Sequence, residues 1–217
     1  MRLKRSLVPV LLLSALAFAH PALAGPPLLC HPFDIGDARS LPWNGATAWF
    51  EGRPDYQIST VVDDTMALLT PSTPVIVRME TLRRSVIYAS ANAQVAATLL
   101  QRLVARANAT EAAGRPDALA FLDAAYAAGA LREIGLLRES APFRDRAAAI
   151  AQVAKAADDY ALITKALAAR PDDPAIHFAA ALIASDSHRS AFEAHKAKAA
   201  AGTAADALLA RNVSHVF

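Results

Sequence analysis

The hydrophobic and polar positions beyond residue 73 follow the spacing of amphipathic helices. Apolar residues recur at intervals of three and four, first at Val75, Met79, Leu82 and Val86 and then at Val95, Leu99 and Leu103. The polar stretch Ser90–Gln94 divides this pattern into two antiparallel helices, and Asn108–Asp117 is predicted to be a loop. Pro74 is expected to be the first residue of the first of these helices. The sequence therefore predicts an all-α fold of antiparallel helical hairpins over residues 74–217.

The remaining predicted helices are separated by short breaks. They cover residues 118–135, 145–169 with a new start at Asp158, 174–185, about 187–201 and 204–211. At one break, Pro171 ends a helix, Asp173 caps the next one and Pro174 begins it. Repetition of helix, break and helix favours a repeat-like array, in which each hairpin buries its apolar face against its neighbours.

Residues 140–201 resemble tetratricopeptide-repeat proteins. The positions that carry the resemblance are Tyr160, Ala166 and Pro171 in one predicted helix and its break, and His177 and Ala180 in the next helix. Phe143 precedes His177 by about 34 residues, the period of that repeat. The resemblance implies a scaffold that binds a protein or peptide partner along a concave face, and not a catalyst.

Residues 25–73 are predicted to be an irregular segment with one short helix. Turn-forming Gly, Pro and Asn recur too often there for a long element, and we expect Trp43, Trp49 and Phe50 to pin the segment down. The short helix is expected over about residues 59–69, because Thr60 and Asp63 have the spacing of a capping box. Residues 25–57 are expected to pack as an N-terminal cap on the helical part.

Residues 1–24 have the three-part pattern of a secretory signal peptide. A basic start is followed by an apolar run over residues 7–19 and by Ala22-Leu23-Ala24 before Gly25. The run is shorter than the roughly 20 residues of a bilayer span. We therefore expect cleavage after Ala24, export to the periplasm or beyond, and no stable membrane span in the mature chain.

The charge balance also depends on the leader. The chain of 217 residues has a formal charge of +2, and this becomes −1 without the three basic residues of the leader. A nearly neutral mature chain gives no electrostatic support for binding nucleic acid. Cys30 is the single cysteine, so no internal disulfide is possible, and its thiol is expected either to be buried or to pair with another chain.

The sequence contains none of the motifs that identify a catalytic, cofactor or metal site. G-x-S-x-G, S-x-x-K, the P-loop and H-E-x-x-H are all missing. His188 and His195 share a predicted helix but lie about 10 Å apart along its axis, too far to hold one ion. His177 falls on the neighbouring predicted helix. We therefore predict no catalytic residue, no cofactor and no metal.

Three functions remain open, and the third of them is a purely structural component of the cell envelope. The leading hypothesis is an exported helical scaffold that binds a protein or peptide partner. The alternative is a small periplasmic hydrolase with its site where residues 31–64 meet the first long helix. The candidate ligand or partner contacts are Asp34, Asp63, Glu80 and Arg83. Arg78–Arg84 is expected to be a solvated face with a Glu80–Arg84 pair. A deep pocket holding the candidate contacts would favour the enzyme, and a shallow groove the scaffold.

Overall fold

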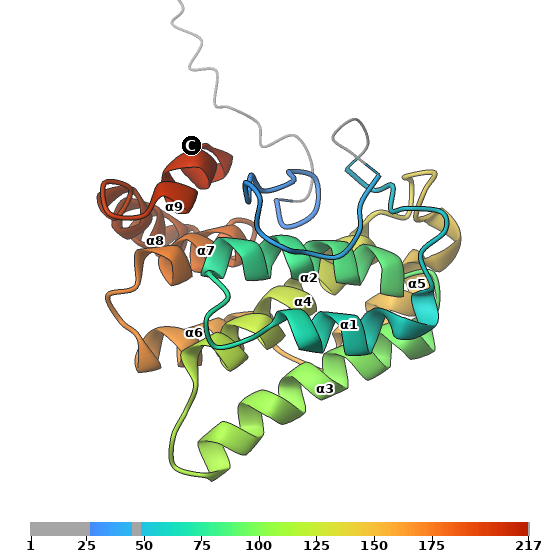
Figure 1. The fold of residues 1–217 in the computed structure, drawn as a ribbon, viewed down its shortest axis with the longest axis horizontal. Helices are drawn as coiled ribbons and strands as arrows, with labels where there is room; N and C mark the ends of the chain where they lie inside the picture. The colour runs from blue at the N-terminus through green and yellow to red at the C-terminus, as the bar shows by residue number, and fades with distance from the viewer. Residues whose placement is uncertain (1–26, 45–48, 217) are drawn as a thin grey trace, which may run out of the picture.

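The computed structural model describes residues 27–44 and 49–216, and the regular elements within these residues are all helices (Figure 1). Two short 3-10 helices, η1 (Ile58–Thr60) and η2 (Val213–Val216), flank the α-helices. The α-helices are α1 (Val61–Leu68), α2 (Val75–Ala89), α3 (Ala93–Ala112), α4 (Ala118–Leu136), α5 (Arg144–Ala154), α6 (Asp159–Ala169), α7 (Pro174–Ala184), α8 (Arg189–Ala201) and α9 (Ala207–Asn212). The predicted fold class is confirmed.

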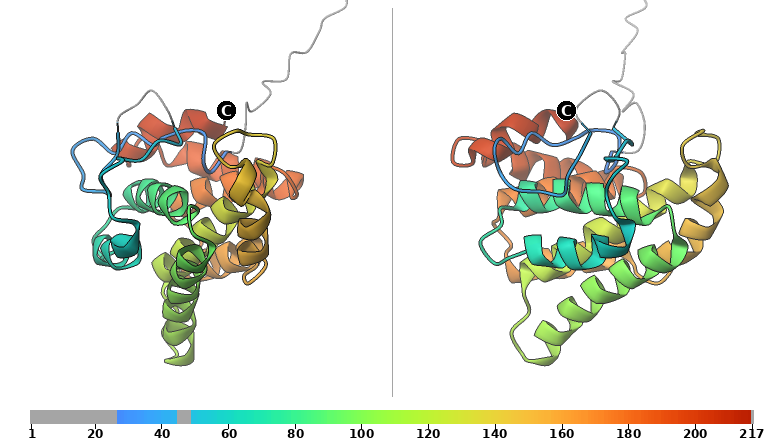
Figure 2. Two further views of the ribbon diagram at one scale, coloured as in Figure 1. Left: turned by 90° about the vertical axis from the view of Figure 1, so that its right-hand side faces the viewer. Right: turned by 45° about the vertical axis from the view of Figure 1, so that its right-hand side comes forward.

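Helix α4 is the centre of the fold. Almost all of its side chains from Ala118 to Gly135 are buried, and a helix that is apolar all round must be enclosed by other elements. It packs against α2, α3, α5, α6 and α7, and Figure 2 shows it inside the assembly. Arg78 of α2 and Asp123 of α4 form a fully buried ion pair at 2.6 Å. Helices α6, α7 and α8 form consecutive hairpins, but no repeat type is established, so the tetratricopeptide resemblance stays a prediction.

Most helix boundaries follow local signals that the sequence carries. At five N-termini a side-chain oxygen accepts a backbone N–H of the first turn, namely at Asn92, Asp117, Asp158, Asp173 and Asp206. Asp173 caps α7, and Pro174 is its first residue, as predicted. Because these caps act within a few residues, they can be found without knowledge of the tertiary fold.

Three local predictions were wrong. Helix α3 continues to Ala112, because Leu103 and Ala107 bury its inner face, and the loop is limited to residues 113–117. Pro74 is the N-cap of α2 and not its first helical residue. The hydroxyl of Thr60 does not cap α1, because Thr60 ends the preceding 3-10 helix with helical backbone angles; its single hydroxyl hydrogen is shared between the carbonyl oxygen of Gln57 and the carboxylate of Asp64.

Residues 27–44 and 49–57 form an irregular segment, here called the strap, that lies across α2 (Figure 1). Its apolar side chains belong to the same hydrophobic core as the helices, and Leu28, Leu29, Phe33 and Leu41 are buried there. Trp49 stacks on Phe143, with ring centroids 5.6 Å apart. The strap is thus irregular as predicted, and it covers a long side of the helical body and not only one end.

The C-terminal part of the chain fixes the strap from the other side. Asn212 is fully buried, and its side chain bonds both the backbone N–H and the backbone carbonyl of Asp34, at 2.8 and 2.9 Å. The ring of His215 lies 5.2 Å from that of Phe33. The strap and the C-terminal end of the described chain, nearly 180 residues apart in the sequence, therefore pack directly against each other.

The structure bears on the prediction about a membrane span but not on the predicted signal peptide. None of the helices in residues 27–44 and 49–216 combines the length and apolar character needed to cross a bilayer. The predicted signal peptide, residues 1–24, lies outside the described residues.

Candidate functional site

One face of α2 carries polar side chains that the strap covers. Glu80, Thr81, Arg83, Arg84 and Tyr88 recur at intervals of three and four residues, so they lie along one side of the helix. Four of them are buried, and Arg84 is 18% exposed. We call these five residues the buried polar row. The prediction of a solvated face at this position was wrong, although the predicted Glu80–Arg84 pair is present at 2.6 Å.

Glu80 is the anion at the centre of the row. Its carboxylate accepts hydrogen bonds from Arg83 at 2.7 and 2.8 Å, from Arg84 at 2.6 Å and from the backbone N–H of Phe33 at 3.1 Å. Burial raises the pKa of Glu80, but the two guanidinium groups outweigh burial and hold this pKa below its ordinary value. Glu80 is therefore ionised, and its buried charge is both paired and hydrogen-bonded.

Thr81 bonds the side chain of Ser40 at 3.0 Å, and the other three residues of the row bind the backbone of the strap. Arg83 donates to the carbonyl oxygen of Trp49 at 2.7 Å, and Arg84 donates to that of Leu41 at 2.6 Å. The hydroxyl of Tyr88 donates to the carbonyl oxygen of Pro42 and accepts the backbone N–H of Arg53, both at 2.7 Å. Because these hydrogen bonds are made to backbone atoms, they fix the path of the strap independently of most of its side chains.

Helix α4 holds the beginning of the strap in the same way. Both carboxylate oxygens of Glu133 accept the backbone N–H of Leu28, at 3.1 and 3.0 Å, and the hydroxyl of Tyr126 donates to the carbonyl of Leu28 at 2.6 Å. Burial raises the pKa of Glu133 well above its ordinary value. Burial, and then the charge of Glu133, raise the pKa of the neighbouring Cys30 thiol to about 11. Glu133 and Tyr126 thus hold the backbone at the beginning of the strap in place.

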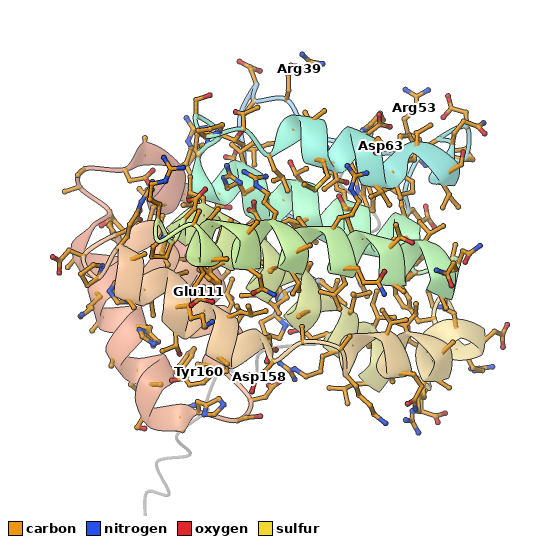
Figure 3. All side chains as sticks on the ribbon, turned by 90° about the horizontal axis from the view of Figure 1, so that it is seen from below. Arg39, Arg53, Asp63, Glu111, Asp158 and Tyr160 are labelled. Carbon is orange, nitrogen blue, oxygen red and sulfur yellow. The ribbon has the colours of Figure 1, made fainter. Side chains whose placement is uncertain are left out.

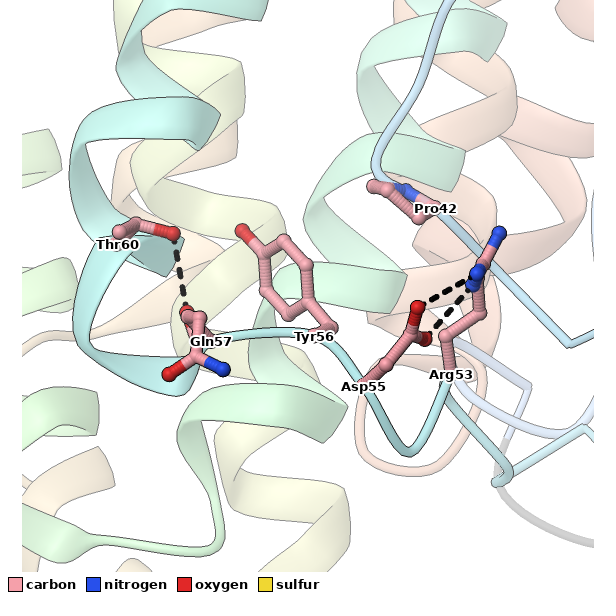
Figure 4. Close-up of a pocket in the computed structure, with 6 residues that line it drawn as sticks. All are labelled: Pro42, Arg53, Asp55, Tyr56, Gln57 and Thr60. Atoms are coloured by element: carbon pink, nitrogen blue, oxygen red, sulfur yellow. Dashed lines mark hydrogen bonds and ion pairs between the residues drawn. The ribbon is translucent and has the colours of Figure 1, made fainter.

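The strap and α1 enclose a surface groove. Two adjoining pockets, of about 270 and 430 Å³, share Pro42 and Tyr56 in their walls. Figure 4 shows the smaller of them. We call the two pockets together the strap groove. It is lined by Arg39, Ser40, Leu41, Pro42, Arg53, Asp55, Tyr56, Gln57, Thr60, Asp64, Ala67 and Leu68.

The groove offers both signs of charge and several hydrogen-bonding groups. Arg53 and Asp55 form a bidentate pair at 2.9 and 2.6 Å, and both side chains are more than half exposed. The hydroxyl groups of Tyr56 and Thr60 both donate to Asp64 at 2.7 Å. Burial, and then the hydrogen bond to Asp64, raise the pKa of Tyr56, so its hydroxyl remains protonated at neutral pH. Its hydrogen stays with Asp64, and its oxygen can accept a hydrogen bond from a bound molecule.

The structure does not gather the four candidate residues of the sequence into one place. Glu80 and Arg83 lie together, but both side chains are fully buried beneath the strap. Asp34 is on the strap, 3.6 Å from the guanidinium of Arg211. Asp63 is on α1, is 78% exposed and pairs with Arg102. In Figure 3, Asp63 lies on the same side of the molecule as Arg39 and Arg53. The role of the four residues as ligand or partner contacts stays a prediction.

Sequence reasoning missed the residues that line the strap groove. The groove forms because Leu41 and Pro42 of the strap are held beside α1, from which they are separated by about twenty residues of chain. One signal was present in the sequence, since Arg53-Pro54-Asp55 places opposite charges on either side of a turn-forming proline. That pattern predicts a charged turn, but it does not indicate which part of the protein the turn lies against.

Neither a cluster of metal-binding side chains nor a similar protein indicates what the protein does. In the part of the chain that the structure describes, no group of three or more His, Cys, Asp or Glu gathers where it could hold a metal ion. Comparison of the chain with protein-family models, curated proteins and solved structures gave no match. The function is therefore argued from geometry.

Proposed function

We propose that the protein is exported and binds a protein or peptide partner in the strap groove. The observation that carries the proposal is the pair of adjoining pockets that share Pro42 and Tyr56. An extended polypeptide segment can place successive side chains in two such pockets while its backbone passes over the shared wall. The mixed charge of the lining suits a polar, solvated segment better than an apolar small molecule.

The walls of the groove support this role because they are held in place before a partner arrives. Arg84 and Tyr88 fix Leu41 and Pro42 on one side, and the hydrogen bonds to Asp64 order the opposite side. Walls that are already ordered lose little conformational entropy on binding, which leaves more of the contact energy for affinity.

The hydrolase alternative has less support from the groove. General acid–base catalysis needs a titrating group with a pKa near the working pH. Burial, and then the hydrogen bond to Asp64, raise the pKa of the Tyr56 phenol and make it a weaker acid. Hydrolysis of ester, peptide and glycoside substrates by the purified protein would favour the alternative, particularly if Asp64→Asn abolished it.

Export is proposed from the pattern of residues 1–24. If it is correct, the chain recovered from the periplasm or the medium begins at Gly25, which N-terminal sequencing would establish. A chain recovered only from the cytoplasm with Met1 intact would contradict it.

Site-specific photo-crosslinking in the producing cell tests the binding proposal. A photoreactive residue would replace Gln57 in the groove, and in the matched control it would replace Gln152, which is also exposed but lies on α5. We expect one protein adduct to form reproducibly at position 57 and not at position 152, and to weaken when Arg39→Glu reverses a charge of the groove. The same adducts at both positions, or none at position 57, would contradict the proposal.

A further inference from the structure

Two histidines that lie far apart in the sequence meet between α7 and α8. The Nδ1 atoms of His177 and His195 are 3.0 Å apart, and the ring planes are inclined by 28°. His177 is 4% exposed, whereas His195 is partly open to solvent. His188, which shares the C-terminal hairpin, takes no part, because its ring stacks on Tyr160 at 3.7 Å between centroids.

A backbone carbonyl fixes the tautomer of His177. Its Nε2 lies 2.8 Å from the carbonyl oxygen of Pro171, and because a carbonyl can only accept, Nε2 carries the hydrogen. In the tautomer with its hydrogen on Nε2, His177 presents a lone pair at Nδ1 towards His195. An imidazole that donates its second N–H to a carbonyl is the arrangement that orients and strengthens histidine ligands in metal sites.

The separation of the two nitrogens is close to that required by one ion. Two imidazole nitrogens at 2.0–2.1 Å from a tetrahedral zinc ion are about 3.3 Å apart. The observed 3.0 Å therefore needs to widen by only about 0.3 Å, and the two rings, which face each other across this contact, must turn so that both lone pairs point to one ion. From this geometry we propose that His177 and His195 form a two-histidine site for a divalent transition metal, copper or zinc, which replaces the proton shared by the two Nδ1 atoms.

Metal binding changes the tautomer of one ring. The proton that leaves Nδ1 of His195 moves through solvent to Nε2 of the same ring, so that each imidazole offers the metal a lone pair at Nδ1.

The rest of the coordination sphere would come from outside the pair. Among the described residues no third His, Cys, Asp or Glu joins the two histidines. Water, or a donor atom of a bound molecule, would complete the sphere, as at open metal sites. Two imidazoles suit copper and zinc, and Cu²⁺ binds most tightly in the general order of divalent metals. The charge of Lys198 opposes a cation and keeps this site weaker than a closed structural site. The site does not depend on the proposed function of the strap groove.

The test is a titration of the purified protein with CuSO₄, and separately with ZnCl₂, in a buffer that does not bind metals. Calorimetry gives the stoichiometry, and electron paramagnetic resonance of the copper form counts the nitrogen ligands. We expect one Cu²⁺ per chain, with the hyperfine pattern of two imidazole nitrogens. His177→Gln and His195→Gln should each abolish that pattern, whereas His188→Gln, the matched control, should leave it unchanged.

Circular dichroism would show that each variant is folded. Because His195 is the more exposed of the two, His195→Gln decides the question if His177→Gln does not fold. Copper and zinc should also raise the melting temperature of the wild type and not that of folded His195→Gln. Equal binding by His195→Gln and the wild type, or a first equivalent of copper without two imidazole ligands, would overturn the proposal.

Discussion

Replacing Glu80 with Gln should destabilise the whole molecule. The substitution preserves size but removes the only carboxylate hydrogen-bonded to Arg83 and Arg84 among the described residues, and Arg83 has no exposed surface. Removing one partner of a buried ion pair costs about 3–5 kcal/mol, because the other charge stays buried. Against a total stability of about 5–15 kcal/mol this is a large fraction. With a urea slope of about 2 kcal/mol per molar, the midpoint should fall by roughly 2 M.

Two optical probes separate the strap from the helices in this experiment. Both tryptophans of the chain, Trp43 and Trp49, lie in the strap, so their fluorescence reports on the strap, while circular dichroism at 222 nm reports on the helices. Because strap and helices share one core, the two transitions should coincide in the wild type. Asp63→Asn is the control, since it removes one exposed ion pair with Arg102 and should cost less than about 1 kcal/mol.

A small change in the free energy of unfolding would contradict this role of Glu80. A loss of less than about 1 kcal/mol for Glu80→Gln, with an unchanged urea slope, would mean that the row does not hold the strap. A fluorescence transition that precedes the loss of helix already in the wild type would mean that the strap is not part of the cooperative core.

Three further predictions concern groups beneath or beside the strap. Because burial raises the pKa of Glu133, the free energy of unfolding should fall as pH rises from the unfolded-state pKa of about 4.3 towards the higher folded-state pKa. Glu133→Gln, whose amide oxygen can still accept the N–H of Leu28, should reduce that fall in urea unfolding measured from pH 5 to 8, and Asp123, whose pKa burial raises to about 7, should account for the part that remains. With a pKa of about 11, native Cys30 should react with iodoacetamide at pH 8 on the order of a hundredfold more slowly than in urea, as measured by mass spectrometry; equal rates would contradict the burial. Gly52→Ala would place a Cβ against the ring of Tyr88, so we expect a lower melting temperature and a weaker crosslink in the strap groove, and an unchanged melting temperature would count against this packing.

The helices could be predicted because their signals are local. Apolar spacing gave the positions of α2 and α3, and the Asp173-Pro174 pair gave the start of α7. The loop prediction at residues 108–117 failed because burial of Ala107 against the rest of the fold extends α3 beyond what its polar residues indicate.

The site could not be predicted in the same way, because its geometry comes from tertiary contacts. The charges of Arg78–Arg84 indicate a solvated helix face when considered alone, and only the strap that covers α2 makes that face part of the interior. The histidines illustrate the same point. Spacing along one helix shows that His188 and His195 lie too far apart to hold one ion. The contact that forms in the structure instead joins His195 to His177 of the adjacent helix.

Hydrogen exchange tests most directly whether the buried groups hold the strap as part of the core. The backbone N–H of Leu28 bonds Glu133, and that of Phe33 bonds Glu80, so neither is free to exchange in the native state. We expect both amides to be protected to nearly the same degree as those in the middle of α4, because they open only with global unfolding. If Leu28 and Phe33 exchange at the rate of an unstructured chain while α4 remains protected, the strap is not held by these residues, and the groove built on it loses its basis.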